Sequence, residues 1–172
     1  MAKLFDLNVT QTEDAKFSSN LGTAHEFFVT GILMRLGFDV SISSVKGGPY
    51  DLLITVYKNG PKSEQDTIKA QAKTCTNSIR FIGGIRGGMD RSYKSEVKQL
   101  VDKSYKYTEK DNDLIIGVQK LTPDLYLIPT RFLKYFGKSK SIAHLACVKN
   151  NWDILLNWRD KYLDDLFSKV GK

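Results

Sequence analysis

Four polar residues in the first half of the chain have the types that phosphodiester hydrolysis requires: Glu26, Asp51, Gln71 and Lys73. A carboxylate can hold a divalent metal ion, and the ion can polarise a phosphoryl oxygen and acidify a water molecule. A lysine can orient or deprotonate that water. We therefore expect Asp51 to bind the metal ion and Lys73 to serve the nucleophile.

The spacing of Gln71 and Lys73 places both side chains on one face of a strand. Residues 67–74 predict an extended segment, in which alternate side chains point to opposite faces. Ala70 and Ala72 then occupy the other face, where their small size suits a helix packed closely against the sheet. The carbonyl oxygens of the Gln71 side chain and of the Ala72 main chain can serve as neutral ligands for a hard cation.

The two carboxylates must reach this strand from other segments. Asp51 opens an apolar strand directly after residues 47–49 (GGP), and this loop can bring its carboxylate to the end of the Gln71 strand. Glu26 lies on an amphipathic helix, which must bury its apolar stripe on the sheet and so brings its early turns near the strand ends. The expected metal ligands are Asp51, Gln71, Ala72 and Glu26.

The hydrophobic pattern predicts the helices and strands that position these residues. A helix from Ser18 to Gly37 follows from apolar residues at intervals of three to four, with Gly37 suited to a left-handed cap. Thr130 is expected to cap a short helix that ends at Gly137, and a last helix is expected over residues 152–170. Strands are expected at residues 38–43, 50–57, 67–74, 113–119 and 125–128.

The length and composition favour one domain. With 172 residues and 41% hydrophobic content, the chain can bury one sizeable core, and we expect a single α/β domain over residues 1–172. Its core, about residues 18–130, would be a central mixed sheet of four or five strands. The first helix and the C-terminal helix would flank this sheet, with a C-terminal helical region over about 130–172.

The sequence also argues against several classes of protein. No stretch approaches the ~20 apolar residues that span a bilayer, and the N-terminus lacks the pattern of a signal peptide. We expect a cytoplasmic protein without a membrane partner. The two cysteines and two histidines show no zinc-site spacing, and nothing suggests a small-molecule cofactor.

The formal net charge of +7 is concentrated in one stretch. Residues 69–106 contain nine basic and three acidic residues, which gives 9 − 3 = +6. Such a stretch binds polyanions because it releases their condensed counterions, so nucleic acid is the first expected partner and an anionic membrane surface the second. A solvated surface is the third interpretation.

A glycine- and arginine-rich segment over residues 77–95 lies within this basic stretch. We expect a mobile loop or a long hairpin there, because the glycines interrupt both helical and strand patterns. The residues expected to contact DNA are Arg80, Arg86, Arg91 and Lys94. The alternative is a hairpin tip without a function of its own.

Three stretches together resemble the PD-(D/E)XK nuclease superfamily: residues 22–26 (GTAHE), 48–54 (GPYDLLI) and 70–74 (AQAKT). They look like its helix glutamate, its PD-type strand and its (D/E)XK-type strand. Gln71 departs from the usual acidic residue, and this departure resembles the QxK motif of the group I intron-encoded homing endonucleases of cyanobacteria. The segment from residue 113 to 129 is also similar to that branch. The matches cover about residues 20–130.

This resemblance implies a restriction-endonuclease-like core and a metal-dependent endonuclease that cuts double-stranded DNA at a specific site. Mg²⁺ is the implied cofactor, with Mn²⁺ as a substitute. One set of site residues per chain can hydrolyse one strand at a time, so cutting both strands calls for a homo-oligomer. A symmetric dimer is the least assembly that suffices, and the homing branch implies a tetramer.

Each site residue also has a structural interpretation. Residues 23–26 (TAHE) fit a capping box, in which Glu26 would return a hydrogen bond to the start of a helix. Asp51 could belong to a turn, and Lys73 could be a solvated strand residue. An aspartate that opens an apolar strand costs burial energy unless it has a partner, which favours the joint catalytic interpretation.

Other functions remain open beside the homing endonuclease. Within the enzymes these are a Holliday-junction resolvase and a restriction endonuclease; outside them, the alternative is a DNA-binding module with a degenerate site. The apolar face of the last helix favours core packing, with a subunit contact as the alternative. This face consists of Leu155, Trp158, Tyr162 and Leu166.

Overall fold

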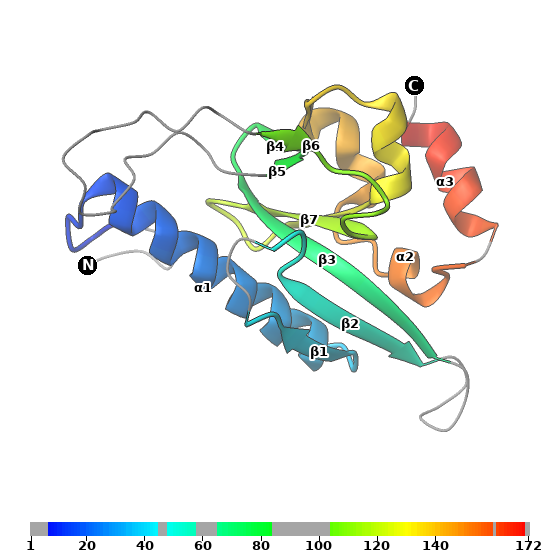
Figure 1. Ribbon diagram of the computed structural model, residues 1–172, viewed down its shortest axis with the longest axis horizontal. Coiled ribbons are helices and arrows are strands. Elements are labelled where there is room, and N and C mark those ends of the chain that lie inside the picture. Colours follow the sequence, from blue (N-terminus) through cyan, green and yellow to red (C-terminus); the bar gives the residue numbers. More distant parts are fainter. Residues whose placement is uncertain (1–6, 45–47, 58–64, 84–103, 160, 171–172) are drawn as a thin grey trace, which may run out of the picture.

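A five-stranded mixed β-sheet carries most of the residues of interest (Figure 1). The computed structural model describes residues 7–44, 48–57, 65–83, 104–159 and 161–170. The strand order is β1-β2-β3-β7-β8, and only β3 and β7 pair in parallel. The strands are β1 (Asp39–Ile42), β2 (Leu52–Tyr57), β3 (Gln65–Cys75), β7 (Leu114–Gln119) and β8 (Leu125–Pro129). The predicted α/β class with a central mixed sheet is confirmed.

The first helix, α1 (Asp14–Arg35), contacts β1 and β3 and buries Val29 and Leu33. Gly37 follows it with φ +93°, the left-handed conformation expected of a C-terminal glycine cap. The helix begins four residues before the predicted start at Ser18. Its first turns carry mostly exposed side chains, so no apolar period marks them. The capping-box interpretation of Glu26 is wrong, because this residue lies in the middle of α1.

The predicted C-terminal helix over residues 152–170 is two helices, α2 (Asp153–Leu156) and α3 (Tyr162–Val170). Between them, Arg159 Nε lies 2.5 Å from the carboxylate of Asp66, a residue of β3 that is 2% exposed. The prediction of one continuous helix is wrong. The spacing of apolar residues carries no information about a long-range ion pair such as this one. Figure 1 shows α1 on one side of the sheet, and α2 and α3 on the other.

Two 3₁₀ helices, η1 (Thr130–Tyr135) and η2 (Ile142–Val148), lie between β8 and α2. The prediction that Thr130 caps a helix is wrong. Its side chain makes no capping hydrogen bond, and its hydroxyl instead donates to Oδ1 of Asn112 at 2.6 Å. Both residues are buried, so the hydroxyl satisfies an acceptor in the interior rather than a helix end.

The beginning of the glycine- and arginine-rich segment is strand. β4 (Ser78–Arg80) pairs with β9 (Ser139–Ser141), and β5 (Ile82–Gly83) pairs with β6 (Tyr105–Lys106). The antiparallel pairing of β5 with β6 agrees with the long-hairpin alternative. A Cβ atom on Gly117 of β7 would come within 2.3 Å of Ile79 of β4, so the small β4–β9 sheet packs directly onto the central one. The rest of the segment, residues 84–95, lies outside the described residues.

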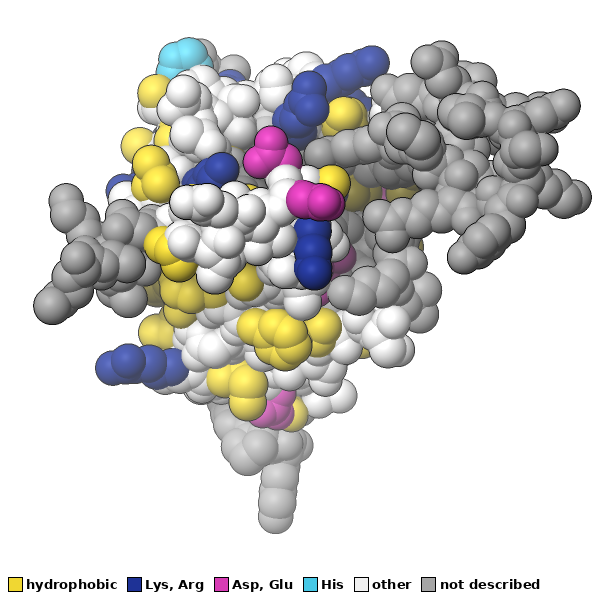
Figure 2. All heavy atoms as spheres, turned by 90° about the vertical axis from the view of Figure 1, so that its left-hand side faces the viewer, with side chains coloured by type: hydrophobic (Ala, Val, Ile, Leu, Met, Phe, Trp, Pro, Cys, Tyr) yellow, Lys and Arg dark blue, Asp and Glu magenta, His cyan; other side chains and the backbone are white. Residues whose placement is uncertain are grey.

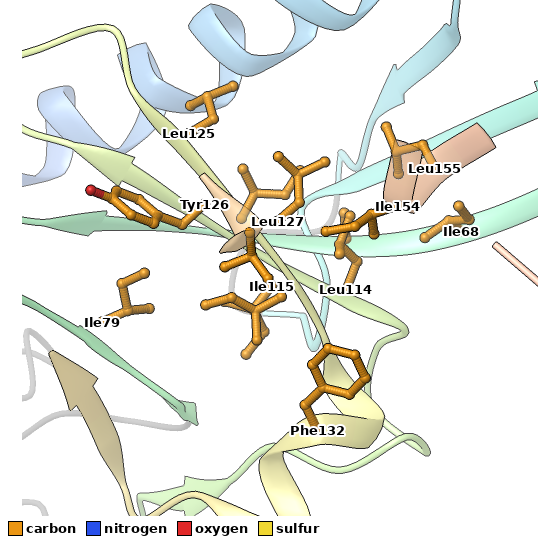
Figure 3. Packing of buried hydrophobic residues seen from close by; sticks show 14 of the residues in the cluster. Ile68, Ile79, Leu114, Ile115, Leu125, Tyr126, Leu127, Phe132, Ile154 and Leu155 are labelled. Atoms are coloured by element: carbon orange, nitrogen blue, oxygen red, sulfur yellow. The ribbon is translucent and has the colours of Figure 1, made fainter. Parts of the chain in front are cut away.

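The core lies around β7 and β8, whose residues are almost all buried. Strands covered on both faces have this continuously apolar character. Figure 3 shows Leu114 and Ile115 of β7 among Ile68 of β3 and Ile154 and Leu155 of α2. The apolar face of the C-terminal region is therefore core packing. Among the described helices, none has the length and apolar character that crossing a membrane requires.

Candidate active site

Four residues singled out from the sequence, Glu26, Asp51, Gln71 and Lys73, line one cleft of about 890 Å³. Glu26 comes from α1, Asp51 from the residue preceding β2, and the other two from β3. Ala72, the remaining expected metal ligand, lines the same cleft. The tertiary structure thus brings together a set that spans nearly fifty positions of sequence.

Asp51 is fixed to β3 by hydrogen bonds from both its main chain and its side chain. Its main-chain N–H donates to the carbonyl of Ala70 at 2.9 Å, which continues the pairing of β2 with β3. Its Oδ2 accepts the main-chain N–H of Ala72 at 2.9 Å and the side-chain amide of Gln71. The carboxylate therefore points along β3 into the cleft instead of into the turn before it.

Burial, and to a smaller extent the neighbouring negative charge of Glu26, raises the pKa of Asp51 to about 6. The N–H of Ala72, the ammonium of Lys73 and the amide of Gln71 act in the opposite direction. The negative charge of Glu26 thus adds to the cost of ionising Asp51 in this cleft. A cation close to Asp51 and Glu26 would offset this cost. A cleft with this distribution of charge is suited to binding a metal ion.

The side chain of Gln71 is 6% exposed, and only one of its two polar atoms has a hydrogen-bond partner among the described residues. Its amide nitrogen donates to Asp51 and, at 3.3 Å, to the carbonyl of Ala72. Its Oε1 has no hydrogen-bond partner among the described residues. A buried acceptor without a partner costs about 1–3 kcal/mol. An oxygen of this kind fits a hard divalent cation.

The oxygen donors of the cleft come from carboxylates, a side-chain amide and a main-chain carbonyl. Within the described parts of the chain, no three histidine, cysteine, aspartate or glutamate side chains gather closely enough to hold a metal ion. A metal ion in the cleft would therefore need the neutral oxygens of Gln71 and Ala72 beside the carboxylates of Asp51 and Glu26. Carboxylate and carbonyl oxygens are ligand types that suit Mg²⁺.

Lys73 lies against a residue that the sequence patterns did not reveal. Its Nζ is 5.0 Å from the ring centroid of Tyr107, which is 3% exposed. The Tyr107 ring in turn packs onto Gly83, where an added Cβ would approach the ring and hydroxyl to 2.7 Å. An ammonium over an aromatic face gains cation–π energy and loses freedom. Tyr107 thus restricts where Lys73 can place its charge.

Asn112 is a second residue that sequence reasoning missed. It is 1% exposed, accepts the hydroxyl of Thr130, and donates from Nδ2 to the carbonyl of Pro49 at 2.9 Å. Pro49 lies two residues before Asp51, so this buried amide ties the segment that carries the carboxylate to the start of β7. Asn112 carries no sequence signal, because only the fold brings residues 49 and 112 together.

The cleft continues past Lys73 to a more basic end. His25 Nδ1 and Thr74 Oγ1 are 2.8 Å apart, and the pKa of His25 is lowered by burial and by the charge of Lys120. Arg80, expected to contact DNA, lines this end and is exposed. The other residues of that expectation, Arg86, Arg91 and Lys94, lie outside the described residues. His25 itself is half-buried.

One solved structure similar to this chain is that of a bacterial homing endonuclease, I-Ssp6803I, with a TM-score of 0.58. The alignment covers 78% of this chain and 90% of that one, at 14% sequence identity. The likeness is one of fold. No protein-family model matches the sequence, and no curated protein matches it closely.

Replacing Asp51 by asparagine should stabilise the protein at neutral pH. Because folding raises the pKa of this acid to about 6, its ionised form is destabilising above pH 6 and the cost disappears as pH falls towards 4. Asp51→Asn should therefore raise the free energy of unfolding by up to about 3 kcal/mol at pH 7.5 and change it little at pH 4. Chemical denaturation at both pH values measures this.

Asp165→Asn, a substitution on the exposed part of α3, is the matched control and should give no such pH-dependent gain. An equal gain from Asp51→Asn at pH 7.5 and pH 4 would contradict the burial of an ionised carboxylate.

Proposed function

We propose that this protein is a metal-dependent endonuclease that hydrolyses phosphodiester bonds of double-stranded DNA at a specific site, in the manner of a homing endonuclease. The observation that carries the proposal is the convergence of Asp51, Gln71, Lys73 and Glu26 in one cleft. The fold shared with a homing endonuclease supports it. The basic stretch over residues 69–106, of which Lys73 and Arg80 line the cleft, fits a nucleic-acid substrate.

Mg²⁺ is the proposed cofactor, with Mn²⁺ as a substitute. Asp51, Glu26, Oε1 of Gln71 and the carbonyl of Ala72 would hold it. When bound, the ion would polarise a phosphoryl oxygen and favour the ionised form of a water molecule. The unsatisfied Oε1 and the raised pKa of Asp51 support this assignment, because a cation satisfies the one and relieves the other.

The protein's own groups then have separate tasks in the proposed reaction. Asp51 is ionised above about pH 6 and available as a ligand. Lys73, restrained by the ring of Tyr107, orients the attacking water and stabilises the negative charge that develops on the phosphate. Arg80, exposed at the basic end, would contact the DNA backbone. Arg86, Arg91 and Lys94 belong to the same proposal from sequence alone.

The alternative enzymes differ in substrate. A Holliday-junction resolvase would prefer four-way junctions to linear duplex in a binding assay. A restriction endonuclease would select a short site from a randomised duplex library, whereas a homing endonuclease would select a long one. The similar fold of a homing endonuclease favours the long site.

Removing Asp51 or Lys73 should abolish cleavage without abolishing folding or DNA binding, because both groups serve the reacting phosphate. The measurement is nicking of supercoiled plasmid by Asp51→Ala and Lys73→Ala in Mg²⁺, with DNA affinity measured separately. Gln71→Glu should keep part of the activity because it supplies an acidic oxygen ligand. Loss of binding in proportion to loss of cleavage would contradict the assignment, and a wild-type chain that never nicks DNA would leave a non-catalytic DNA-binding module.

Breaking the Asn112 bridge should weaken metal binding, since it frees the segment that carries Asp51. Asn112→Leu removes both side-chain hydrogen bonds, and calorimetric titration with Mg²⁺ and Mn²⁺ measures the change. The matched control is Asn151→Leu. Asn151 also bridges two segments, through Cys147 and Tyr162, but neither its partners nor Asn151 itself lines the cleft or belongs to the segment that carries Asp51. Both variants should lose roughly 1–3 kcal/mol of stability, and only Asn112→Leu should bind metal more weakly.

We also propose that the active form is a homo-oligomer, a dimer or a tetramer, because one site per chain must act on two strands. Light scattering with size-exclusion chromatography, at low concentration and with DNA, should report at least two 19.5 kDa chains. Mixing wild-type and Asp51→Ala protein should produce nicked duplex, because mixed assemblies carry one working site. A monomer on its preferred duplex, with only linear or uncut product from the mixture, would refute this assembly.

A further inference from the structure

The candidate cleft carries opposite charges at its two ends. Its acidic lining residues are Glu26 and Asp51, which lie at the end where metal binding is proposed. Beyond Lys73 the lining includes Cys75, Ile82, Gly83 and Tyr107, and its polar members carry hydroxyl, amide or basic side chains: Thr74, Thr76, Asn77, Ser78, Arg80 and Lys120. A cation is stabilised at the acidic end and an anion at the basic end. The cleft therefore has room and charge for a second ligand group beside the reacting one.

Three elements meet at the basic end and fix its donors. The 2.8 Å hydrogen bond between His25 and Thr74 joins α1 to β3. The main-chain N–H of Lys120, the residue after β7, donates to the carbonyl of Cys75 at 2.8 Å. The Lys120 ammonium lies 5.9 Å from the ring centroid of Phe17 on α1. These donors are therefore held in place by the fold, which reduces the entropy lost when they bind a ligand.

The charge of Lys120 is available for such a ligand. The salt bridges among the described residues join other pairs, and Lys120 has no acidic partner among them. On the described part of the face in Figure 2, lysine and arginine side chains are scattered among acidic and hydrophobic ones. An ammonium beside a hydroxyl donor suits a phosphate oxygen.

We propose that Lys120 and Thr74 form a second phosphate subsite, with His25 as the residue that positions the Thr74 hydroxyl. Its ligand is the phosphodiester next to the reacting one in the same nucleic-acid strand. Thr74 lies two residues beyond Ala72 on β3, about 6.6 Å along an extended strand, which is comparable to the length of one nucleotide. The inference rests on the proposed function, because it takes the reacting phosphate to lie at Asp51.

The first test measures DNA binding without divalent metal, so that no cleavage is involved. Lys120→Ala should weaken binding and reduce the slope of log affinity against log salt by roughly 0.9. Lys120→Arg should restore the slope. The control is Lys110→Ala, which removes an exposed lysine outside the cleft and should leave the slope unchanged. Thermal unfolding of each variant identifies any loss of fold.

The second test locates the phosphate on a duplex that the protein cuts. A neutral methylphosphonate in place of the phosphate next to the cut should slow nicking by the wild type roughly tenfold, the effect of one charge-assisted hydrogen bond. The same modification should slow Lys120→Ala no further, because the interaction is already lost. Thr74→Val should give a smaller loss with the same dependence on that phosphate.

Equal salt slopes for wild type and Lys120→Ala, or independent losses from the methylphosphonate and the substitution, would overturn the subsite. Binding of inorganic phosphate that duplex DNA does not displace would also overturn it, in favour of a free-phosphate site. The proposed nuclease fails separately: a chain that shows the change in salt slope but nicks no DNA retains the subsite and loses the activity. A chain that nicks DNA but shows the same salt slope for wild type and Lys120→Ala retains the activity and loses the subsite.

Discussion

The attachment of the Asp51 carboxylate to β3 is the interaction on which the candidate site depends. The carboxylate is partly buried near Glu26, and its ionised form is costly there. Hydrogen bonds from Ala72 and Gln71 offset part of that cost and point the group into the cleft. A bound cation would remove the remaining cost. The arrangement therefore lowers the stability of the metal-free protein and would raise the affinity of this position for a cation.

The parallel pairing of β3 with β7 extends this arrangement along the whole cleft. Because the two strands run side by side in one direction, the start of β7 lies near the Asp51 end and its finish near Cys75. Asn112, just before β7, braces the segment that carries Asp51, while Lys120, just after it, reaches the basic end. One strand thus supports both ends of the site, and its apolar residues form the middle of the core.

The basic stretch and the fold make complementary contributions to the functional argument. Positive charge alone fits nucleic acid, a membrane surface or plain solvent exposure. The structure places Lys73 and Arg80 of that stretch in the same cleft as the carboxylates. At 14% identity, the likeness to a homing endonuclease shows that this arrangement of helix and sheet accommodates a very different sequence. The specific chemistry therefore has to be argued from the side chains in the cleft.

The sequence alone determined the α/β class, the five strands of the central sheet and the four residues that converge in the cleft. Strand periodicity is local and strong, and the types of Asp51, Gln71 and Lys73 are visible without coordinates. The tertiary structure decided where α1 begins, where the C-terminal helix breaks, and that Thr130 faces Asn112 instead of capping a helix. It also revealed Tyr107, Asn112 and Lys120. Their roles depend on contacts between residues far apart in the chain, and local spacing carries no information about such contacts.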